Sequence, residues 1–313
     1  MSVISICRLY LAVLCFCLCA YNGHAQGCNR RHVTISELED IFIGRCVDFQ
    51  TTIHPEHFCS SGMKDCQDLW KKFSSPFLNN PPCNVTADLY SDFVTAAHHP
   101  IIGKQLFYSG LGGFAQRYSS QGRRFTIQED TLIGHLGNGL SFCGGDAGND
   151  STMPCERWNP ETCPNTASGD FWVAGSRNFA QNAIGNVYVL LNATRDPIYK
   201  ATSFFNKYEV PELRTGVVKK VTALLINDSP STKRDPCGTD ESVEILKTTL
   251  NEKNIDFDCK ENPRDLVYLY CVDHVEMDVC RTNVPSLIDE AAGFHANFQL
   301  ILLVFFVHFF FRK

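Results

Sequence analysis

The cysteines constrain the fold of this chain more than any other feature of its sequence. The chain has 313 residues and 16 cysteines, four of which (Cys7, Cys15, Cys17 and Cys19) lie in an N-terminal apolar segment. The others are scattered without a CxxC pair: Cys28, Cys46, Cys59, Cys66, Cys83, Cys143, Cys155, Cys163, Cys237, Cys259, Cys271 and Cys280. In a secreted chain, an even number of scattered cysteines is typical of a disulfide framework. We therefore expect six disulfides and no metal site.

Both ends of the chain indicate export to the cell surface. Arg8, the apolar run 9–20 and Gly23-His24-Ala25 together predict a signal peptide over residues 1–25. The C-terminal apolar run 298–311 is shorter than the ~20 residues that a membrane-spanning helix needs. We therefore expect residues 286–313 to be a glycosylphosphatidylinositol anchor signal, with a true anchor helix as the alternative.

The processed chain is acidic and carries glycosylation motifs. Trimming residues 1–25 and 292–313 removes three basic residues and no acidic one, so the net charge falls from −6 to −9. This balance argues against a nucleic-acid partner. Sequons at Asn84, Asn149, Asn192 and Asn227 predict an extracellular glycoprotein, although Pro230 weakens the last. We expect the protein at the outer face of the plasma membrane, and the sequence leaves a homodimer open.

Helix and strand patterns predict a mixed α/β (α+β) fold with two lobes. Expected helices cover a segment capped by Ser36 and Glu39, then 65–73, 87–97 (capped by Thr86), 169–183 and 240–252. Expected strands cover 105–109, 187–191, 221–226, 254–257 and 266–272. Their alternation predicts a mostly parallel sheet of four to five strands, flanked by helices. We assign residues 26–104 and 125–183 to a helical lobe, and 105–124 and 184–285 to an α/β lobe.

The stretch 125–144 predicts a short amphipathic helix that begins at Thr126. Glu129 and Asp130 fall near its positive N-terminal end, and Gly137-Asn138-Gly139 interrupts the helical period. This is either an ordinary capped helix or a pair of carboxylates held in place for a functional role.

A glycine motif near the first strand suggests a nucleotide-binding oxidoreductase. Residues 110–115 match G-x-G-x-x-A, and Glu129 follows at the distance of a ribose-binding acid. The spacer 116–124 is too rich in serine and glycine to predict the required helix. We therefore favour a flexible glycine turn and rank this function last.

Aromatic residues and one acid are further candidates. Tyr108, Phe142, Trp172 and the pair Phe204-Phe205 fit either a core or a cleft that stacks flat rings. Glu209 precedes Pro211, which argues against a helix, and it fits either a lone buried carboxylate or a salt bridge to Lys207. The local sequence by itself favours the salt bridge.

From about Arg45 to Cys280, the chain resembles the ADP-ribosyl cyclase and NAD+ glycohydrolase family. The shared segments are Gly44-Arg45-Cys46-Val47, Ile53-His54-Pro55-Glu56, Pro82-Cys83-Asn84-Val85-Thr86, Leu106-Phe107-Tyr108-Ser109, Glu129-Asp130-Thr131-Leu132-Ile133-Gly134, Phe171-Trp172, Leu191-Asn192-Ala193-Thr194-Arg195 and Tyr208-Glu209-Val210.

The resemblance implies a role for particular residues. Glu209 takes the position of the catalytic glutamate, Trp172 that of the ring that stacks on nicotinamide, and Glu129 that of the acid governing cyclisation against hydrolysis. Tyr108 stands where mammalian members have a second tryptophan. Further substrate-binding residues implied by the family are Asp130, Ser109, Phe204, Phe205, Ser176 and Arg177. Gly110 replaces an arginine beside Ser109, so phosphate binding must depend on other groups.

The same resemblance implies the disulfide pairing. It transfers as Cys46–Cys66, Cys83–Cys163, Cys143–Cys155, Cys237–Cys259 and Cys271–Cys280. Cys28 and Cys59 then remain, and we pair them by elimination. One mammalian disulfide falls at Ile102 and Ile184, where we expect packing to replace the covalent tie.

The function implied is an extracellular NAD+ glycohydrolase with ADP-ribosyl cyclase capability. It would cleave the nicotinamide–ribose bond of NAD+ to give nicotinamide, ADP-ribose and some cyclic ADP-ribose. NAD+ would be the substrate, with no separate cofactor and no metal. The alternative is a catalytically weak, lipid-anchored binding or adhesion ectodomain on the same fold, which the loss of the arginine at Gly110 supports.

Overall fold

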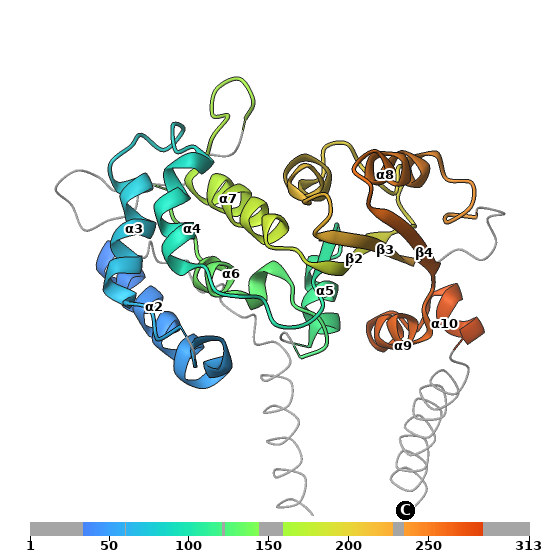
Figure 1. The fold of residues 1–313 in the computed structure, drawn as a ribbon, viewed down its shortest axis with the longest axis horizontal. Helices are drawn as coiled ribbons and strands as arrows, with labels where there is room; N and C mark the ends of the chain where they lie inside the picture. The colour runs from blue at the N-terminus through green and yellow to red at the C-terminus, as the bar shows by residue number, and fades with distance from the viewer. Residues whose placement is uncertain (1–33, 60, 121–122, 144–158, 228–234, 284–313) are drawn as a thin grey trace, which may run out of the picture.

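The computed structural model describes residues 34–59, 61–120, 123–143, 159–227 and 235–283 (Figure 1). The predicted signal peptide, the anchor signal and the Asn149 sequon lie outside these residues. Within the described part of the chain, no helix is both long and apolar enough to cross a membrane.

One half of the molecule is helical and surrounds a core of phenylalanine rings (Figure 1). Its helices are α2 (Ile35–Asp48), α3 (Cys66–Leu78), α4 (Ser91–Ala97), α6 (Leu132–Gly137) and α7 (Ala167–Gln181). The Phe73 ring lies 4.8 Å from that of Phe142 and 5.4 Å from that of Phe171, both edge to face. Such contacts fix the relative orientation of the helices as well as burying apolar surface.

The starts of two predicted helices need correction. Thr34, not Ser36, caps α2: its hydroxyl accepts a hydrogen bond from the Glu37 amide, and the Glu37 carboxylate accepts one from the Thr34 amide. Both pairs have the capping-box spacing, which sequence alone does not distinguish. Thr86 precedes a 3-10 turn, Ala87–Tyr90, without a side-chain cap, and α4 begins only after that turn.

The other half holds a four-stranded parallel sheet, which confirms the predicted fold class. Its strands, in the order β1-β2-β3-β4, are β1 (Leu106–Ser109), β2 (Gly185–Asn192), β3 (Val218–Ile226) and β4 (Asp256–Glu261). Helices cover both faces, as continuous apolar strands require (Figure 1). α8 (Glu241–Glu252) packs on one face, whereas α5 (Gly112–Ser119) and α9 (Arg264–Asp273) pack on the other.

Two segments differ from their sequence prediction. Residues 266–272 form most of α9 rather than a fifth strand, because Leu266, Val267 and Tyr270 share the helix face that packs on the sheet. A short apolar run fits either state. Residues 112–119 form α5 rather than a flexible turn, since Gly110 makes the turn and Ser119 and Ser120 only end the helix.

Four predicted disulfides are present: Cys46–Cys66, Cys83–Cys163, Cys237–Cys259 and Cys271–Cys280. Cys143 is also disulfide-bonded, and its predicted partner, Cys155, lies outside the described residues. The predicted Cys28–Cys59 bond is wrong, because Cys59 is a free, exposed thiol. Pairing the two remaining cysteines by elimination ignores the distance between them, whereas a disulfide requires its two Cβ atoms to lie within about 4.5 Å of each other.

Two further expectations about the surface are wrong. Ile102 and Ile184 are 52% and 70% exposed, so these side chains do not form a buried packing contact in place of the family disulfide. Asn227 is buried, and its amide nitrogen donates to the Glu261 carboxylate at 2.7 Å, so this sequon is not an accessible glycosylation site. Asn84 is exposed and Asn192 half-buried.

Candidate active site

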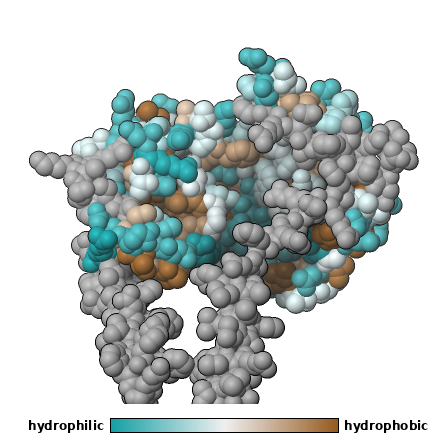
Figure 2. Space-filling view, turned by 180° about the vertical axis from the view of Figure 1, so that it is seen from behind, coloured by the Kyte–Doolittle hydropathy of each residue, from teal (hydrophilic) through white to brown (hydrophobic). Residues whose placement is uncertain are grey.

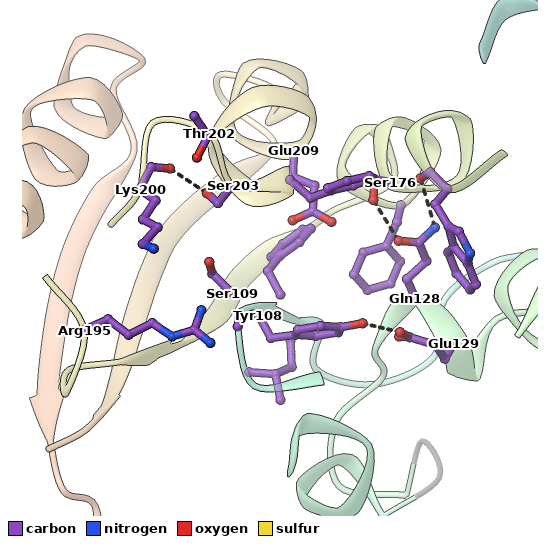
Figure 3. A pocket seen from close by; sticks show the side chains of 16 residues that line it. Tyr108, Ser109, Gln128, Glu129, Ser176, Arg195, Lys200, Thr202, Ser203 and Glu209 are labelled. Carbon is purple, nitrogen blue, oxygen red and sulfur yellow. Dashed lines mark hydrogen bonds between the residues drawn. The ribbon is translucent and has the colours of Figure 1, made fainter. Parts of the chain in front are cut away.

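A cavity of about 540 Å³ opens where β1 and β2 end, between the sheet and α7 (Figure 3). Its walls come from the ends of strands, from α7 and from the loops around them. The lining residues are Leu106, Phe107, Tyr108, Ser109, Gly110, Gln128, Glu129, Trp172, Ser176, Phe179, Arg195, Lys200, Thr202, Ser203, Phe204 and Glu209. The carboxyl ends of parallel strands are where open α/β sheets commonly bind ligands.

Glu209 enters this cavity from a short irregular helix. It ends a π-helical turn, Phe205–Glu209, which continues into a 3-10 turn, Val210–Glu212. Our expectation that Pro211 keeps this segment from being helical is therefore wrong, since proline is tolerated in the first turn of a new helix. The local preference for a Lys207 salt bridge is also wrong: Glu209 is 6% exposed and points into the cavity (Figure 3).

The Glu209 carboxyl is poorly compensated for its burial. One oxygen, Oε2, has no hydrogen-bond partner within the described part of the chain. Burial raises the pKa of Glu209 to about 8, the hydroxyl of Ser176 opposes this shift, and the nearby Glu129 carboxylate adds to it. A buried acid with a strongly raised pKa in a cavity is typical of a functional group.

Glu129 forms the opposite wall together with Tyr108. The Tyr108 hydroxyl donates a hydrogen bond to Glu129 Oε1. Burial raises the pKa of the Glu129 carboxyl, although the Tyr108 hydrogen bond opposes this, and burial beside Glu129 raises the pKa of Tyr108. Strand β1 thus holds the Tyr108 ring against Glu129, the acid that the resemblance associates with the balance of cyclisation and hydrolysis.

The predicted helix start at Thr126 is wrong. Thr126 pairs with Gln105 in a β-bridge, and Thr131 caps α6, with its hydroxyl accepting from the Gly134 amide. Glu129 therefore lies in a 3-10 turn, Gln128–Asp130, that precedes α6. The two acids also diverge, because the Asp130 carboxylate accepts from the Ile127 amide at 3.1 Å.

Gln128 is a cavity residue that sequence reasoning missed. The Ser176 hydroxyl donates to Gln128 Oε1 at 2.8 Å, and the Gln128 amide nitrogen lies 3.5 Å from the carbonyl oxygen of Trp172. A Cβ at Gly175 would lie 2.3 Å from this nitrogen, so a glycine in α7 admits the contact. Only its position beside Glu129 in sequence pointed to Gln128.

Arg195 and Lys200 were also missed as site residues. They lie on one side of the cavity, with Glu129 on the other and Glu209 between them (Figure 3). Neither cation forms an ion pair with another residue that the structure describes. Arg195 had appeared only as the last residue of a shared family segment, which gave no indication of where its side chain points.

Three predicted site residues do not line this cavity. Asp130 caps its own turn, as described above. Phe205 is fully buried behind the cavity, with its ring 5.5 Å from that of Phe107. Arg177 faces a neighbouring cavity, where it contacts the Asp88 carboxylate at 3.3 Å. The structure does bring Glu209, Trp172, Tyr108, Glu129, Ser109, Phe204 and Ser176 together around one cavity.

A group of side chains that could hold a metal ion lies away from this cavity. Within the described residues, His54, Glu56 and His57 form one group whose ligand atoms lie within 4.8 Å of one another. None of the three lines the cavity around Glu209. The cavity itself presents carboxylates, hydroxyls and rings, without a histidine or cysteine among its lining residues.

Residues 35–280 match the family model described as ADP-ribosyl cyclase. The chain belongs to the ADP-ribosyl cyclase family. The match spans most of the chain and includes both the helical half and the sheet, so it confirms the resemblance drawn from the motifs.

Characterised family members are similar over most of their length. The chain is 33% identical to an ADP-ribosyl cyclase/cyclic ADP-ribose hydrolase of Aplysia californica, covering 80% of this chain and 88% of that protein. It is 34% identical to the ADP-ribosyl cyclase/cyclic ADP-ribose hydrolase 1 of Mus musculus, over 80% and 81% of the two chains.

Solved structures of family members share the fold. An ADP-ribosyl cyclase in complex with N1-cIDPR gives a TM-score of 0.70 at 33% identity, covering 80% of this chain and 99% of that one. Aplysia cyclase with substrate NGD and product cGDPR gives 0.69 at 33% identity, over 78% and 96%. Porcine CD38 with a covalent intermediate gives 0.65 at 29% identity, over 74% and 99%.

Proposed function

We propose that this chain is an NAD+ glycohydrolase with ADP-ribosyl cyclase activity. It cleaves the nicotinamide–ribose bond of NAD+ and releases nicotinamide, ADP-ribose and some cyclic ADP-ribose. The observation that carries the proposal is a buried carboxyl, Glu209, which faces the same cavity as Trp172 and Tyr108 and has one oxygen without a hydrogen-bond partner among the residues that the structure describes. The activities named for its relatives in the family support the same reaction.

One carboxylate is sufficient for this chemistry. Glycosidases that cleave oxygen glycosides use a second carboxyl to protonate the leaving group. The nicotinamide of NAD+ is already cationic, so it departs neutral and needs no proton. Glu209 then stabilises the ribosyl cation or forms a covalent bond to the anomeric carbon. The porcine relative, solved with a covalent intermediate, supports the second course.

The cationic ring also makes Glu209 ready to react. In the empty cavity, the raised pKa of about 8 favours the protonated carboxyl near neutral pH. A bound nicotinamide cation beside Glu209 lowers this pKa, because a nearby opposite charge favours the ionised carboxylate. Substrate binding would therefore generate the reactive form, with Trp172 and Tyr108 holding the ring and excluding water.

The products depend on which nucleophile reaches the anomeric carbon. Water gives ADP-ribose, whereas the adenine N1, folded back onto that carbon, gives cyclic ADP-ribose. A well-placed intramolecular nucleophile has a very high effective concentration, so geometry decides the ratio. Glu129 and the 44%-exposed ring of Phe204 are the residues that we assign to this folding. NAD+ is the substrate, and we assign no separate cofactor or metal to the reaction.

Nicotinamide release by the purified ectodomain tests the proposal. We expect wild type to release nicotinamide from NAD+, and Glu209→Gln to fold normally while turning over at least 100-fold more slowly. Glu212→Gln is the matched control, because Glu212 lies on the adjacent turn, outside the cavity, bonded to Gln181 at 2.9 Å. Near-normal release by Glu209→Gln would remove Glu209 from the mechanism, and no release by wild type would leave the binding-ectodomain alternative.

We also propose that the protein is secreted, glycosylated at Asn84 and Asn192, and held at the outer face of the plasma membrane by a lipid anchor. The apolar runs at both ends support this location, as does the disulfide framework. Release from cells by a phosphatidylinositol-specific phospholipase distinguishes the lipid anchor from an anchor helix. Sedimentation of the released protein tests whether it forms a homodimer.

A further inference from the structure

The end of β1 lacks the cation that the family resemblance leads one to expect there. Ser109 is followed by Gly110 instead of arginine, and Gly110 has a φ of +72°, a conformation that favours glycine. A Cβ built on Gly110 would lie 1.9 Å from the Arg195 Nη1 atom and 2.5 Å from its Cζ atom. The Arg195 guanidinium therefore occupies the space beside residue 110 that any larger side chain would need.

The loop after β2 brings Arg195 to this position. β1 and β2 are paired with Ser109 opposite Leu191, so the loop after β2 begins beside the end of β1. Asn192 then folds the loop, because its Oδ1 atom accepts hydrogen bonds from the amide and the hydroxyl of Thr194, at 3.0 and 2.6 Å. This turn directs the Arg195 side chain back across the strand end toward Ser109 (Figure 3).

The cavity is consequently polarised. Arg195 and Lys200 lie on one side, while Glu209 and Glu129 lie in the middle and on the far side (Figure 3). NAD+ has the complementary polarity, with a cationic nicotinamide ring at one end and a dianionic diphosphate further along. With the ring beside the acids, the diphosphate falls toward the two cations. A planar guanidinium is suited to paired phosphate oxygens.

We propose that Arg195, with Lys200 as a second cation, binds the diphosphate of the substrate and takes over the role of the arginine that Gly110 replaces. This inference rests on the proposed function. It explains how the chain retains phosphate binding, and it gives a reason for Gly110: glycine leaves room for a cation supplied by the loop after the neighbouring strand, β2.

Binding of ADP-ribose tests this inference without turnover. In a Glu209→Gln background, calorimetry should show that Arg195→Gln weakens ADP-ribose binding about 10- to 100-fold, as for the loss of a charge-assisted hydrogen bond. Binding of nicotinamide riboside, which has no phosphate, should change less than twofold. Arg214→Gln, an exposed arginine outside the cavity, should alter neither.

A double-mutant cycle tests the role of Gly110. Gly110→Ala should weaken ADP-ribose binding when Arg195 is present, because the new methyl group displaces the guanidinium, and should add little in an Arg195→Gln background. Melting temperatures of each variant separate misfolding from lost binding. If the losses of ADP-ribose binding free energy from the two substitutions simply add in the double variant, Gly110 does not serve to make room for Arg195.

Two outcomes separate this inference from the proposed function. If wild type releases nicotinamide but Arg195→Gln binds ADP-ribose as tightly as its parent, the diphosphate site is elsewhere and this inference fails alone. If wild type neither releases nicotinamide nor binds ADP-ribose, both fail together. The expected pattern in the otherwise wild-type enzyme is a raised KM for NAD+ with a largely retained kcat.

Discussion

At the scale of single residues, Glu209 combines features that are costly for folding and useful for chemistry. It is buried, one of its oxygens lacks a partner among the described residues, and a second acid lies nearby. Burying a carboxyl in this way opposes its ionisation. A cation that binds in the cavity stabilises the ionised carboxylate. The free energy that burial of Glu209 costs the protein is thereby recovered when a cationic substrate binds.

This cost should be measurable as a pH dependence of stability. Folding raises the Glu209 pKa from 4.5 to about 8. An acid with a raised folded-state pKa contributes stability that is fully present below pH 4.5 and is lost as the pH rises toward 8. Glu209→Gln cannot ionise, so its melting temperature should match wild type near pH 4 and exceed it by a few degrees near pH 8. A constant difference across this range would contradict the raised pKa.

At the scale of elements, the turn that carries Glu129 depends on its contact with α6. A Cβ at Gly134, in the first turn of α6, would lie 2.0 Å from the Gln128 carbonyl oxygen. That neighbour is backbone and cannot move without shifting the turn. Glycine at this position therefore allows the turn and the helix to pack closely.

Gly134→Ala should accordingly displace Glu129 and destabilise the protein. We expect a loss of about 1–3 kcal/mol, the usual cost of overpacking, and an altered ratio of cyclic ADP-ribose to ADP-ribose. Gly113→Ala in α5 is the matched control, because a Cβ there meets no atom within 4 Å. Removing a glycine from an exposed helix position should leave stability unchanged or raise it slightly. Equal effects of the two substitutions on melting temperature would contradict this account.

At the scale of the whole molecule, disulfides tie the helical half together across long stretches of sequence. Cys83–Cys163 joins residues 80 positions apart and connects the segment before α4 to the segment before α7, whereas Cys271–Cys280 closes only 9 positions. Cross-links that close longer loops remove more entropy from the unfolded chain. The two bonds should therefore differ in their effect on stability.

Replacing Cys83 and Cys163 together by serine should cost about 4.5 kcal/mol, and replacing Cys271 and Cys280 about 2.5 kcal/mol, on the chain-entropy estimate. Chemical denaturation of both double variants measures the difference. Activity should also fall further in the first, because α7 carries Trp172 and Ser176 into the cavity. The reverse order of stability losses would argue against loop entropy as the main contribution.

On the face shown in Figure 2, apolar side chains lie in separate patches among hydrophilic residues. Exposed apolar residues that are scattered over a protein surface are common and need no special explanation. Ile102 and Ile184 are both exposed, so these side chains do not replace the family disulfide by buried packing.

The sequence by itself determined the class of fold, the parallel strands and the identity of the family, because apolar periodicity and ordered motifs are local signals. It also gave Glu209, Trp172, Tyr108 and Glu129 as candidate site residues, because the family motifs include them, and the structure places all four around one cavity. Predictions from the sequence were wrong where the local signals were ambiguous. An apolar run fitted both a strand and α9, and elimination paired Cys59 without regard to distance.

Only the tertiary structure decided which side chains meet. The salt bridge of Glu209 with Lys207 was the natural local choice, but packing against α7 turned the carboxyl into the cavity instead. Arg195 reaches the end of β1 because strand pairing places the loop after β2 beside Gly110. Contacts between residues more than 80 positions apart depend on sheet register and helix packing, which no short stretch of sequence specifies.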